Sequence, residues 1–210
     1  MKKIISYIRK TVKEEKAIVR FVVIIFFIGL ISGSLFLNFI TEHDKNLLIN
    51  QIVSFFNSIK KLSTDVFGMK VFYDNFLSNF IQLAALFVLG LSMIGIIAVI
   101  VILFFKGFMI GTSIGSIILK YQLKGVIGSV LYAFPVLILN VFIYLFMAFF
   151  AVYVSKNFVK ALIHKDTLNF KNFFGKYLLV FLINVLLIGI TSLLDSYLTP
   201  LLLKLFTFIV

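Results

Sequence analysis

The sequence contains no cysteine and no tryptophan, only two prolines, and few charged residues, which make up 13% of its 210 positions. The absence of cysteine excludes disulfide bonds and cysteine-ligated metals. The low charged fraction excludes an ordinary soluble globular domain, in which about 25% of residues are charged. The hydrophobic fraction of 62% excludes an intrinsically disordered chain.

Acidic residues are also scarce, because 8 Asp and Glu stand against 20 Lys and Arg, which gives a formal net charge of +12. In a soluble protein this excess would suggest nucleic acid. Here the apolar residues form long uncharged runs such as residues 75–105. Basic loops of membrane proteins set topology and meet anionic lipid headgroups. The sequence therefore predicts an all-α, polytopic integral membrane bundle that contacts membrane lipids and no nucleic acid.

Charge and hydropathy divide this single membrane domain into five expected spans and three polar segments. Residues 1–20 form a basic amphipathic N-terminus, residues 41–75 an extracytoplasmic amphipathic arm, and residues 155–176 a second basic segment. The two basic segments are expected in the cytoplasm, which places the C-terminus outside. The expected spans are 21–40, 80–105, 107–121, 129–154 and 177–194. Residues 195–210 are expected to form a C-terminal tail.

One of these segments has two interpretations. The segment 107–121 follows Lys106 and includes an uncharged run of only 13 residues, 107–119, before Lys120. This is shorter than the roughly 20 apolar residues that a spanning helix needs. The segment is therefore either a short span whose terminal lysine reaches outward or a re-entrant segment. Asp195 is taken as the residue that closes the last span, so no acid is expected inside a span.

Residues suited to catalysis are not grouped in the sequence. His43 and His164 fall on opposite sides of the expected membrane, and neither has a carboxylate at metal-ligand spacing. We therefore predict a protein that is not an enzyme, with no catalytic, cofactor-binding or metal-binding residues. The polar residues in the spans are expected to form hydrogen bonds between helices, with a permease as the alternative. They are Gln82, Ser92, Lys106, Asn140 and Asn184.

Glycine spacing is the most specific local pattern. Gly107, Gly111 and Gly115 repeat every four residues, and Gly29 and Gly33 have the same spacing. Glycines at this spacing allow helix backbones to approach closely in lipid. The pattern predicts helix packing, either within this chain or with a second chain. In contrast, Gly125 is expected in a loop, where space is free.

The polar arm carries an apolar stripe at alternating spacings of four and three, which is typical of an amphipathic helix. Three surfaces are available to bury it: the outer leaflet, the chain's own helices, or the groove of a partner protein. The stripe is therefore a candidate docking site for partners. Its residues are Leu48, Ile52, Phe55, Ile59 and Leu62.

Several motifs together resemble the stage II sporulation protein M family. The residues that carry the resemblance are Leu89-Gly90-Leu91-Ser92-Met93-Ile94-Gly95, Phe105-Lys106-Gly107-Phe108-Met109-Ile110-Gly111, then Gly115 and Pro135, with Gly29 and Gly33 in the first span. The resemblance extends over roughly residues 20–195, and the proline is expected to kink its helix. These motifs consist of glycines and a lysine, so they point to helix packing rather than to bond-breaking chemistry.

The resemblance implies a multi-pass cell-membrane protein at the sporulation septum. In that role it would hold two peptidoglycan-degrading partners, the stage II sporulation proteins D and P, for septal thinning and engulfment of the forespore. It implies no cofactor. The family also has members in organisms that make no spores, and self-association stays open. The alternative function is the membrane subunit of a transporter that works with a separate ATPase.

Overall fold

The computed structural model of the chain describes residues 2–61, 69–133, 136–164 and 170–209. These residues form seven helices and, within the described ranges, no strand, which confirms the predicted all-α class. The helices are α1 (Lys2–Glu14), α2 (Lys16–Phe36), α3 (Glu42–Lys61), α4 (Met69–Gly90), α5 (Gly95–Ala133), α6 (Val136–His164) and α7 (Phe170–Ile209).

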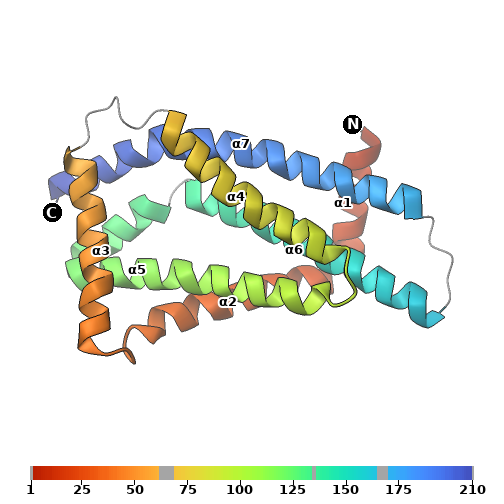
Figure 1. Cartoon of the computed structure of the whole chain (residues 1–210), viewed down its shortest axis with the longest axis horizontal. Helices are drawn as coiled ribbons and strands as arrows, with labels where there is room; N and C mark the ends of the chain where they lie inside the picture. Colours follow the sequence, from red (N-terminus) through yellow and green to blue (C-terminus); the bar gives the residue numbers. More distant parts are fainter. Residues whose placement is uncertain (1, 62–68, 134–135, 165–169, 210) are drawn as a thin grey trace.

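Five of the helices are long and apolar enough to cross a membrane, namely α2, α4, α5, α6 and α7. The chain is therefore a multi-pass membrane protein. These five run lengthwise through the molecule, whereas α3 lies across one end and α1 crosses near the opposite end, short of the ends of α6 and α7 (Figure 1). We call these the basic end, where α1 lies, and the α3 end.

The boundary between the second and third spans differs from the sequence expectation. Instead of a span over 80–105 that stops at Lys106, α4 ends at Gly90 and α5 begins at Gly95. The turn between them contains only apolar and small residues, so no charge marks it in the sequence. Lys106, conversely, lies within α5, and its side chain is accommodated by contacts with other helices.

The chain reverses direction at Gln122, where the helical backbone is interrupted by a φ of 50° and a ψ of −126°. After this reversal, the hydroxyl of Ser129 donates to the carbonyl of Ile114 at 3.5 Å, so the two parts of α5 lie side by side. Residues 107–121 are thus the second half of a continuous span, neither a short span nor a re-entrant segment. The expected free space at Gly125 is also wrong, because a Cβ there would lie 2.8 Å from the Cα of Ile118.

The remaining helices extend beyond their expected limits. α6 replaces the expected span 129–154 and continues to His164. α7 includes the expected span 177–194 and also residues 195–209 of the segment 195–210 that was expected to be a tail. Asp195 therefore lies inside a long helix and does not close it. Polar residues at helix ends can continue the helix into the interfacial region, so they do not mark its last turn. Pro135 lies outside the described residues.

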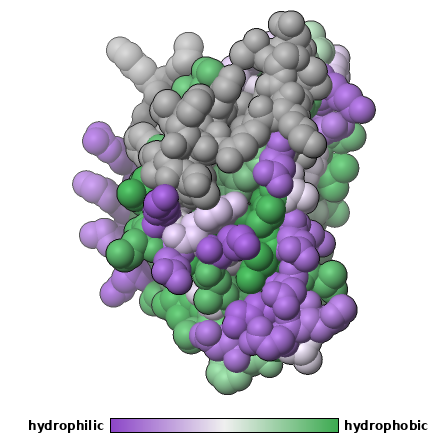
Figure 2. All heavy atoms as spheres, turned by 90° about the vertical axis from the view of Figure 1, so that its left-hand side faces the viewer, coloured by the Kyte–Doolittle hydropathy of each residue, from purple (hydrophilic) through white to green (hydrophobic). Residues whose placement is uncertain are grey.

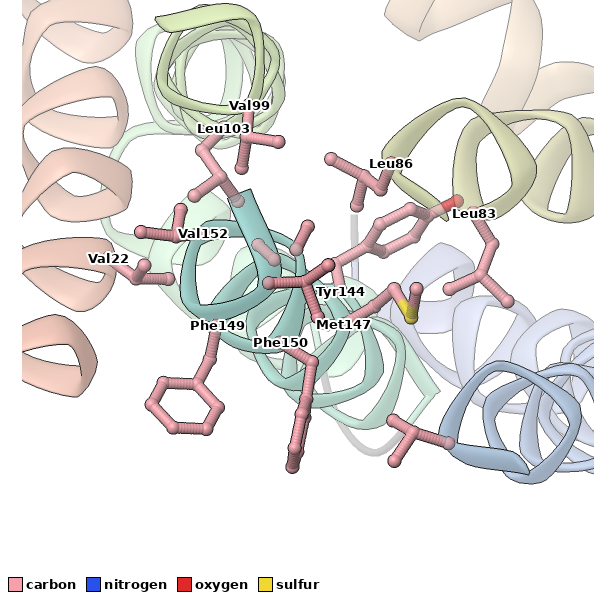
Figure 3. Close-up of a cluster of buried hydrophobic side chains, with 14 of the residues drawn as sticks. Val22, Leu83, Leu86, Val99, Leu103, Tyr144, Met147, Phe149, Phe150 and Val152 are labelled. Atoms are coloured by element: carbon pink, nitrogen blue, oxygen red, sulfur yellow. The ribbon is translucent and has the colours of Figure 1, made fainter. Parts of the chain in front are cut away.

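The core of the bundle is centred on α6, half of whose spanning residues are buried. Met147 and Phe150 of α6 belong to one hydrophobic cluster, which also contains Leu83 of α4, Leu103 of α5 and Val22 of α2 (Figure 3). The outer helices, in contrast, leave large apolar side chains exposed on the sides of the bundle. In lipid such exposure carries no hydrophobic penalty, so one central helix suffices to organise the others.

Candidate functional site: the glycine seam, a buried lysine and helix α3

Helices α2 and α5 approach each other at the level of their backbones. A Cβ added at Gly29 would overlap the carbonyl oxygen of Phe104, and one at Gly33 would overlap that of Phe108. Close backbone approach of this kind is what small residues permit in membrane helices. The glycines of the first span therefore face the repeat in α5, within one chain.

The repeat in α5 is reciprocal. A Cβ at Gly107 would lie 3.0 Å from the amide nitrogen of Leu30, and one at Gly111 would overlap the Leu30 carbonyl. At Gly115 the nearest atom, at 2.7 Å, is the Cδ1 of Leu37, which belongs to a side chain. We call this interface the glycine seam, formed by Gly29, Gly33, Gly107, Gly111 and Gly115.

The other two motif glycines form the tight turn between α4 and α5. A Cβ at Gly90 would overlap the hydroxyl of Tyr177, and one at Gly95 would overlap the carbonyl of Leu89. Within the turn, the amide of Ser92 donates to Leu89 O at 2.9 Å, and the amide of Gly95 donates to Ser92 O at 3.1 Å. The family motif around these residues therefore encodes a compact helix–helix connection at the basic end.

Two residues that sequence reasoning missed support this turn. The hydroxyl of Ser155 in α6 donates to Ser92 O at 2.7 Å, and the hydroxyl of Tyr177 in α7 donates to Phe87 O at 3.1 Å. The first bond adds a second donor to a carbonyl of the turn, and the second pairs a carbonyl in the last turn of α4, where helical partners run out. In the sequence Ser155 falls in the expected basic loop and Tyr177 resembles an ordinary interfacial tyrosine, so neither carries a recognisable signal.

Lys106 lies among three helices inside the bundle. Its Nζ donates to Oε1 of Gln82 in α4 at 2.8 Å and lies 4.5 Å from the ring centroid of Tyr144 in α6. The hydroxyl of Tyr144 in turn donates to the backbone carbonyl of Asn79 at 3.0 Å. A cation within about 6 Å of an aromatic face is attracted by the ring. The side chain of Lys106 thus joins α4, α5 and α6.

We expect Lys106→Met to lower the thermal unfolding midpoint of the detergent-purified protein, because it leaves the amide of Gln82 unpartnered at a cost of about 1–3 kcal/mol. The double variant Lys106→Met with Gln82→Leu removes both polar partners and should recover most of the loss. The unfolding midpoint of Gln82→Leu alone is measured for comparison. If the double variant lowers the midpoint by the sum of the two single-variant losses, the two side chains are not coupled as described.

A row of polar contacts joins α7 to its neighbours toward the α3 end. The hydroxyl of Thr191 donates to Oδ1 of Asn140 at 2.6 Å. The carboxylate of Asp195 accepts from Nδ2 of Asn75 at 3.0 Å and from the hydroxyl of Thr199 at 2.6 Å. The expectation that no acid lies inside a span is therefore wrong. The sequence gives no sign that Asp195 continues the helix, because its hydrogen-bond partner on α4 is 120 positions away.

The fifth polar residue of the spans, Asn184, is fully buried. Its Nδ2 donates to Val180 O at 2.8 Å and lies 3.9 Å from the sulfur of Met147. Its Oδ1 and the hydroxyl oxygen of Ser192 are buried and have no hydrogen-bond partner among the described residues. In the described ranges, no group of three or more His, Asp or Glu side chains is arranged to hold a metal ion.

Helix α3 packs on the chain's own bundle. Phe56, which is only 3% exposed, forms a small cluster with Ile52 of the same helix and with Ile117, Tyr121 and Leu131 of α5. The rings of Phe56 and Tyr121 meet edge to face at a centroid distance of 5.8 Å. Of the three surfaces considered for the apolar stripe, the bundle itself contacts this part of the arm.

The predicted stripe is thus only partly placed. Leu48 and Ile52 are half-buried. The side chains of Phe55, Ile59 and Leu62 lie outside the described residues. The exposed side of α3 is polar, and hydrophilic side chains gather over the right-hand part of the α3 end (Figure 2). We call this side the outer face of α3; it consists of His43, Asn46, Leu47, Asn50 and Asn57.

At the basic end, α1 is attached to the bundle by polar contacts. Glu15, between α1 and α2, pairs with Lys156 of α6 at 2.7 Å. The Nζ of Lys176 lies 4.6 Å from the ring centroid of Tyr7. Burial raises the pKa of Tyr7 to about 12, so its hydroxyl stays protonated at neutral pH. These contacts fix the crossing helix on α6 and α7.

The fold and these contacts define a class: a polytopic helical membrane protein in which backbone-level glycine packing and interhelical polar contacts organise the bundle. The family model for stage II sporulation protein M matches residues 22–200, and the chain belongs to this family. It is therefore a sporulation-related membrane protein. No curated protein and no solved structure matches the chain.

Proposed function

We propose that the chain is a non-enzymatic membrane scaffold that holds the peptidoglycan-degrading stage II sporulation proteins D and P at the sporulation septum. There it would support septal thinning and engulfment. The observation that carries the proposal is the family match over residues 22–200, which includes the described spanning helices except the first residues of α2 and the last residues of α7. The use of polar side chains for contacts between helices supports a structural role.

The arrangement of α3 supports a specific docking surface. One side of the helix is held on α5 through Phe56, whereas His43, Asn46 and Asn50 on the outer face are exposed. The proposed docking site is therefore the outer face of α3, on the opposite side from the half-buried Leu48 and Ile52. The positive-inside rule places this helix outside the cytoplasm, where wall-degrading partners act.

The experiment is an affinity pull-down from sporulating cells. The variant Asn46→Arg with Asn50→Arg and Asn57→Arg places three bulky cations on the outer face. We expect it to recover about tenfold less of the two hydrolases than the wild type at equal membrane levels, which corresponds to about 1.4 kcal/mol. The matched control, Lys120→Ala with Lys124→Ala, changes exposed residues at the same end outside α3 and should recover both partners normally.

Two results would contradict the proposal. Equal recovery of the hydrolases by the Asn46→Arg triple variant would remove the docking site from α3. A single cysteine at Asn46 tests the orientation without background, because the chain has no native cysteine. Failure of an impermeant maleimide to label Asn46→Cys in intact cells would place α3 on the wrong side of the membrane for these partners.

A second candidate function, the membrane subunit of a transporter with a separate ATPase, is favoured by one observation. Ionisable residues within membrane-spanning helices often mark substrate or ion pathways, and here Lys106 and Asp195 both lie within such helices. The same pull-down distinguishes the two functions. Recovery of an ATPase in place of the hydrolases would favour the transporter.

A further inference from the structure

A cavity of about 500 Å³ opens at the basic end, where α1 meets α2. We call it the elbow groove. Two of its lining side chains are apolar and three are basic; they are Val12, Lys13, Lys16, Val19 and Arg20. The surface of the groove is therefore mostly apolar, and three of the residues that line it are exposed basic side chains.

The acidic residues nearest in sequence do not neutralise these basic side chains. Glu14 pairs with Lys10 at 3.8 Å, and Glu15 pairs with Lys156 of α6 at 2.7 Å. Across the described part of the chain, none of the ion pairs involves Lys13, Lys16 or Arg20. Three cations at one groove repel one another, so an anion bound among them would lower the electrostatic free energy.

The apolar surface continues from the groove along α2. Ile24 and Ile28 follow Arg20 at intervals of four residues, so they lie on the same side of the helix. They are 54% and 47% exposed, and Ile31, one turn further, is 56% exposed. The side of α2 that begins with Lys16 and Arg20 thus continues as an exposed apolar surface along the helix, away from the basic end.

We propose that the elbow groove is a binding site for an anionic phospholipid. Lys13, Lys16 and Arg20 would hold the headgroup phosphate, with the planar guanidinium donating two hydrogen bonds. The acyl chains would lie along Ile24 and Ile28. A free phosphate ion would match the three cations but leave the apolar surface unused. The basic end is expected on the cytoplasmic side, where anionic lipids attract basic pockets between helices.

The test uses the full-length protein in a mild detergent. Native mass spectrometry measures how much phosphatidylglycerol stays bound, compared with phosphatidylcholine of the same acyl chains. The wild type should retain phosphatidylglycerol preferentially. The variant Lys13→Gln with Lys16→Gln and Arg20→Gln should weaken this binding by about tenfold or more. The control Arg9→Gln with Lys10→Gln and Lys160→Gln removes the same number of charges at the same end and should bind like the wild type.

Each alternative result overturns the proposal. Equal weakening in both triple variants would mean that only the total charge of the basic end matters. Equal retention of the two lipids would exclude a site for an anionic headgroup. Complete displacement of the lipid by inorganic phosphate would identify a site for a soluble anion. Arg20→Gln alone serves if the triple variant does not fold, and it should still weaken phosphatidylglycerol binding by about threefold; unchanged binding in this variant would likewise overturn the site.

Discussion

Replacing Gly111 with leucine is expected to prevent α2 and α5 from docking and to abolish accumulation of the folded protein. A Cβ at this position would already overlap the carbonyl oxygen of Leu30. The obstacle is backbone and cannot rotate away, so the helices must separate along the glycine seam. Overpacking in a well-packed interior costs about 1–3 kcal/mol. We expect a loss at or above the upper limit, because separation also forfeits dispersion contacts along both helices.

The control for this substitution is Gly175→Leu in α7. Among the residues that the structure describes, none has an atom within 4 Å of the position where its Cβ would be. Gly115→Ala provides an intermediate case, because the nearest atom is the movable Cδ1 of Leu37. Membrane levels and thermal unfolding midpoints in detergent should therefore fall in the order Gly175→Leu, Gly115→Ala, Gly111→Leu. Comparable levels and midpoints for Gly111→Leu and Gly175→Leu would refute the seam.

Phe56→Ala is expected to release α3 from the end of the bundle. The substitution empties the small cluster with Ile117 and Tyr121, and Phe→Ala changes at buried sites cost about 3–5 kcal/mol. The cluster is remote from the main core, so we expect local opening without loss of the spanning bundle. Maleimide labelling of Ile52→Cys in the otherwise cysteine-free chain should become about tenfold faster or more when Phe56→Ala is added.

Leu47→Ala is the matched control on the same helix. Leu47 is 50% exposed on the outer face of α3, so its removal should leave the labelling rate of Ile52→Cys unchanged. Equal labelling rates in the Phe56→Ala and Leu47→Ala backgrounds would show that Phe56 does not attach α3.

Several features were predictable because they depend on local sequence. Long uncharged runs indicate that helices span the membrane, since such runs must be buried in lipid, but the run 75–105 includes parts of both α4 and α5. The glycine repeats indicate close helix packing, although only the structure assigns it to α2 and α5. The α4–α5 turn was not predictable, because Lys106 was taken as the end of a span while its hydrogen-bond partner was unknown. Gln82, the partner that allows Lys106 to lie inside a helix, is 24 positions away.

The amphipathic character of α3 was predictable from periodicity, but the buried aromatic residue was not. The stripe contains Ile52 and Phe55, whereas the structure buries the adjacent Phe56 against α5. Neighbouring residues on a helix differ by only about 100° in direction. Which of them is buried is decided by the surface underneath, in this case Ile117 and Tyr121, and that surface is not encoded in the periodicity of the arm.

The two crossing helices have a consequence for how the protein responds to bilayer thickness. An ordinary transmembrane helix adapts to a thinner bilayer by tilting. Here α3 lies across one end of the spans and α1 crosses near the opposite end, and both are attached to them (Figure 1). Tilting the bundle would drive one end of each crossing helix into hydrocarbon and lift the other into water. We therefore expect the bundle to resist tilting, so that the surrounding lipid adjusts its thickness to the protein.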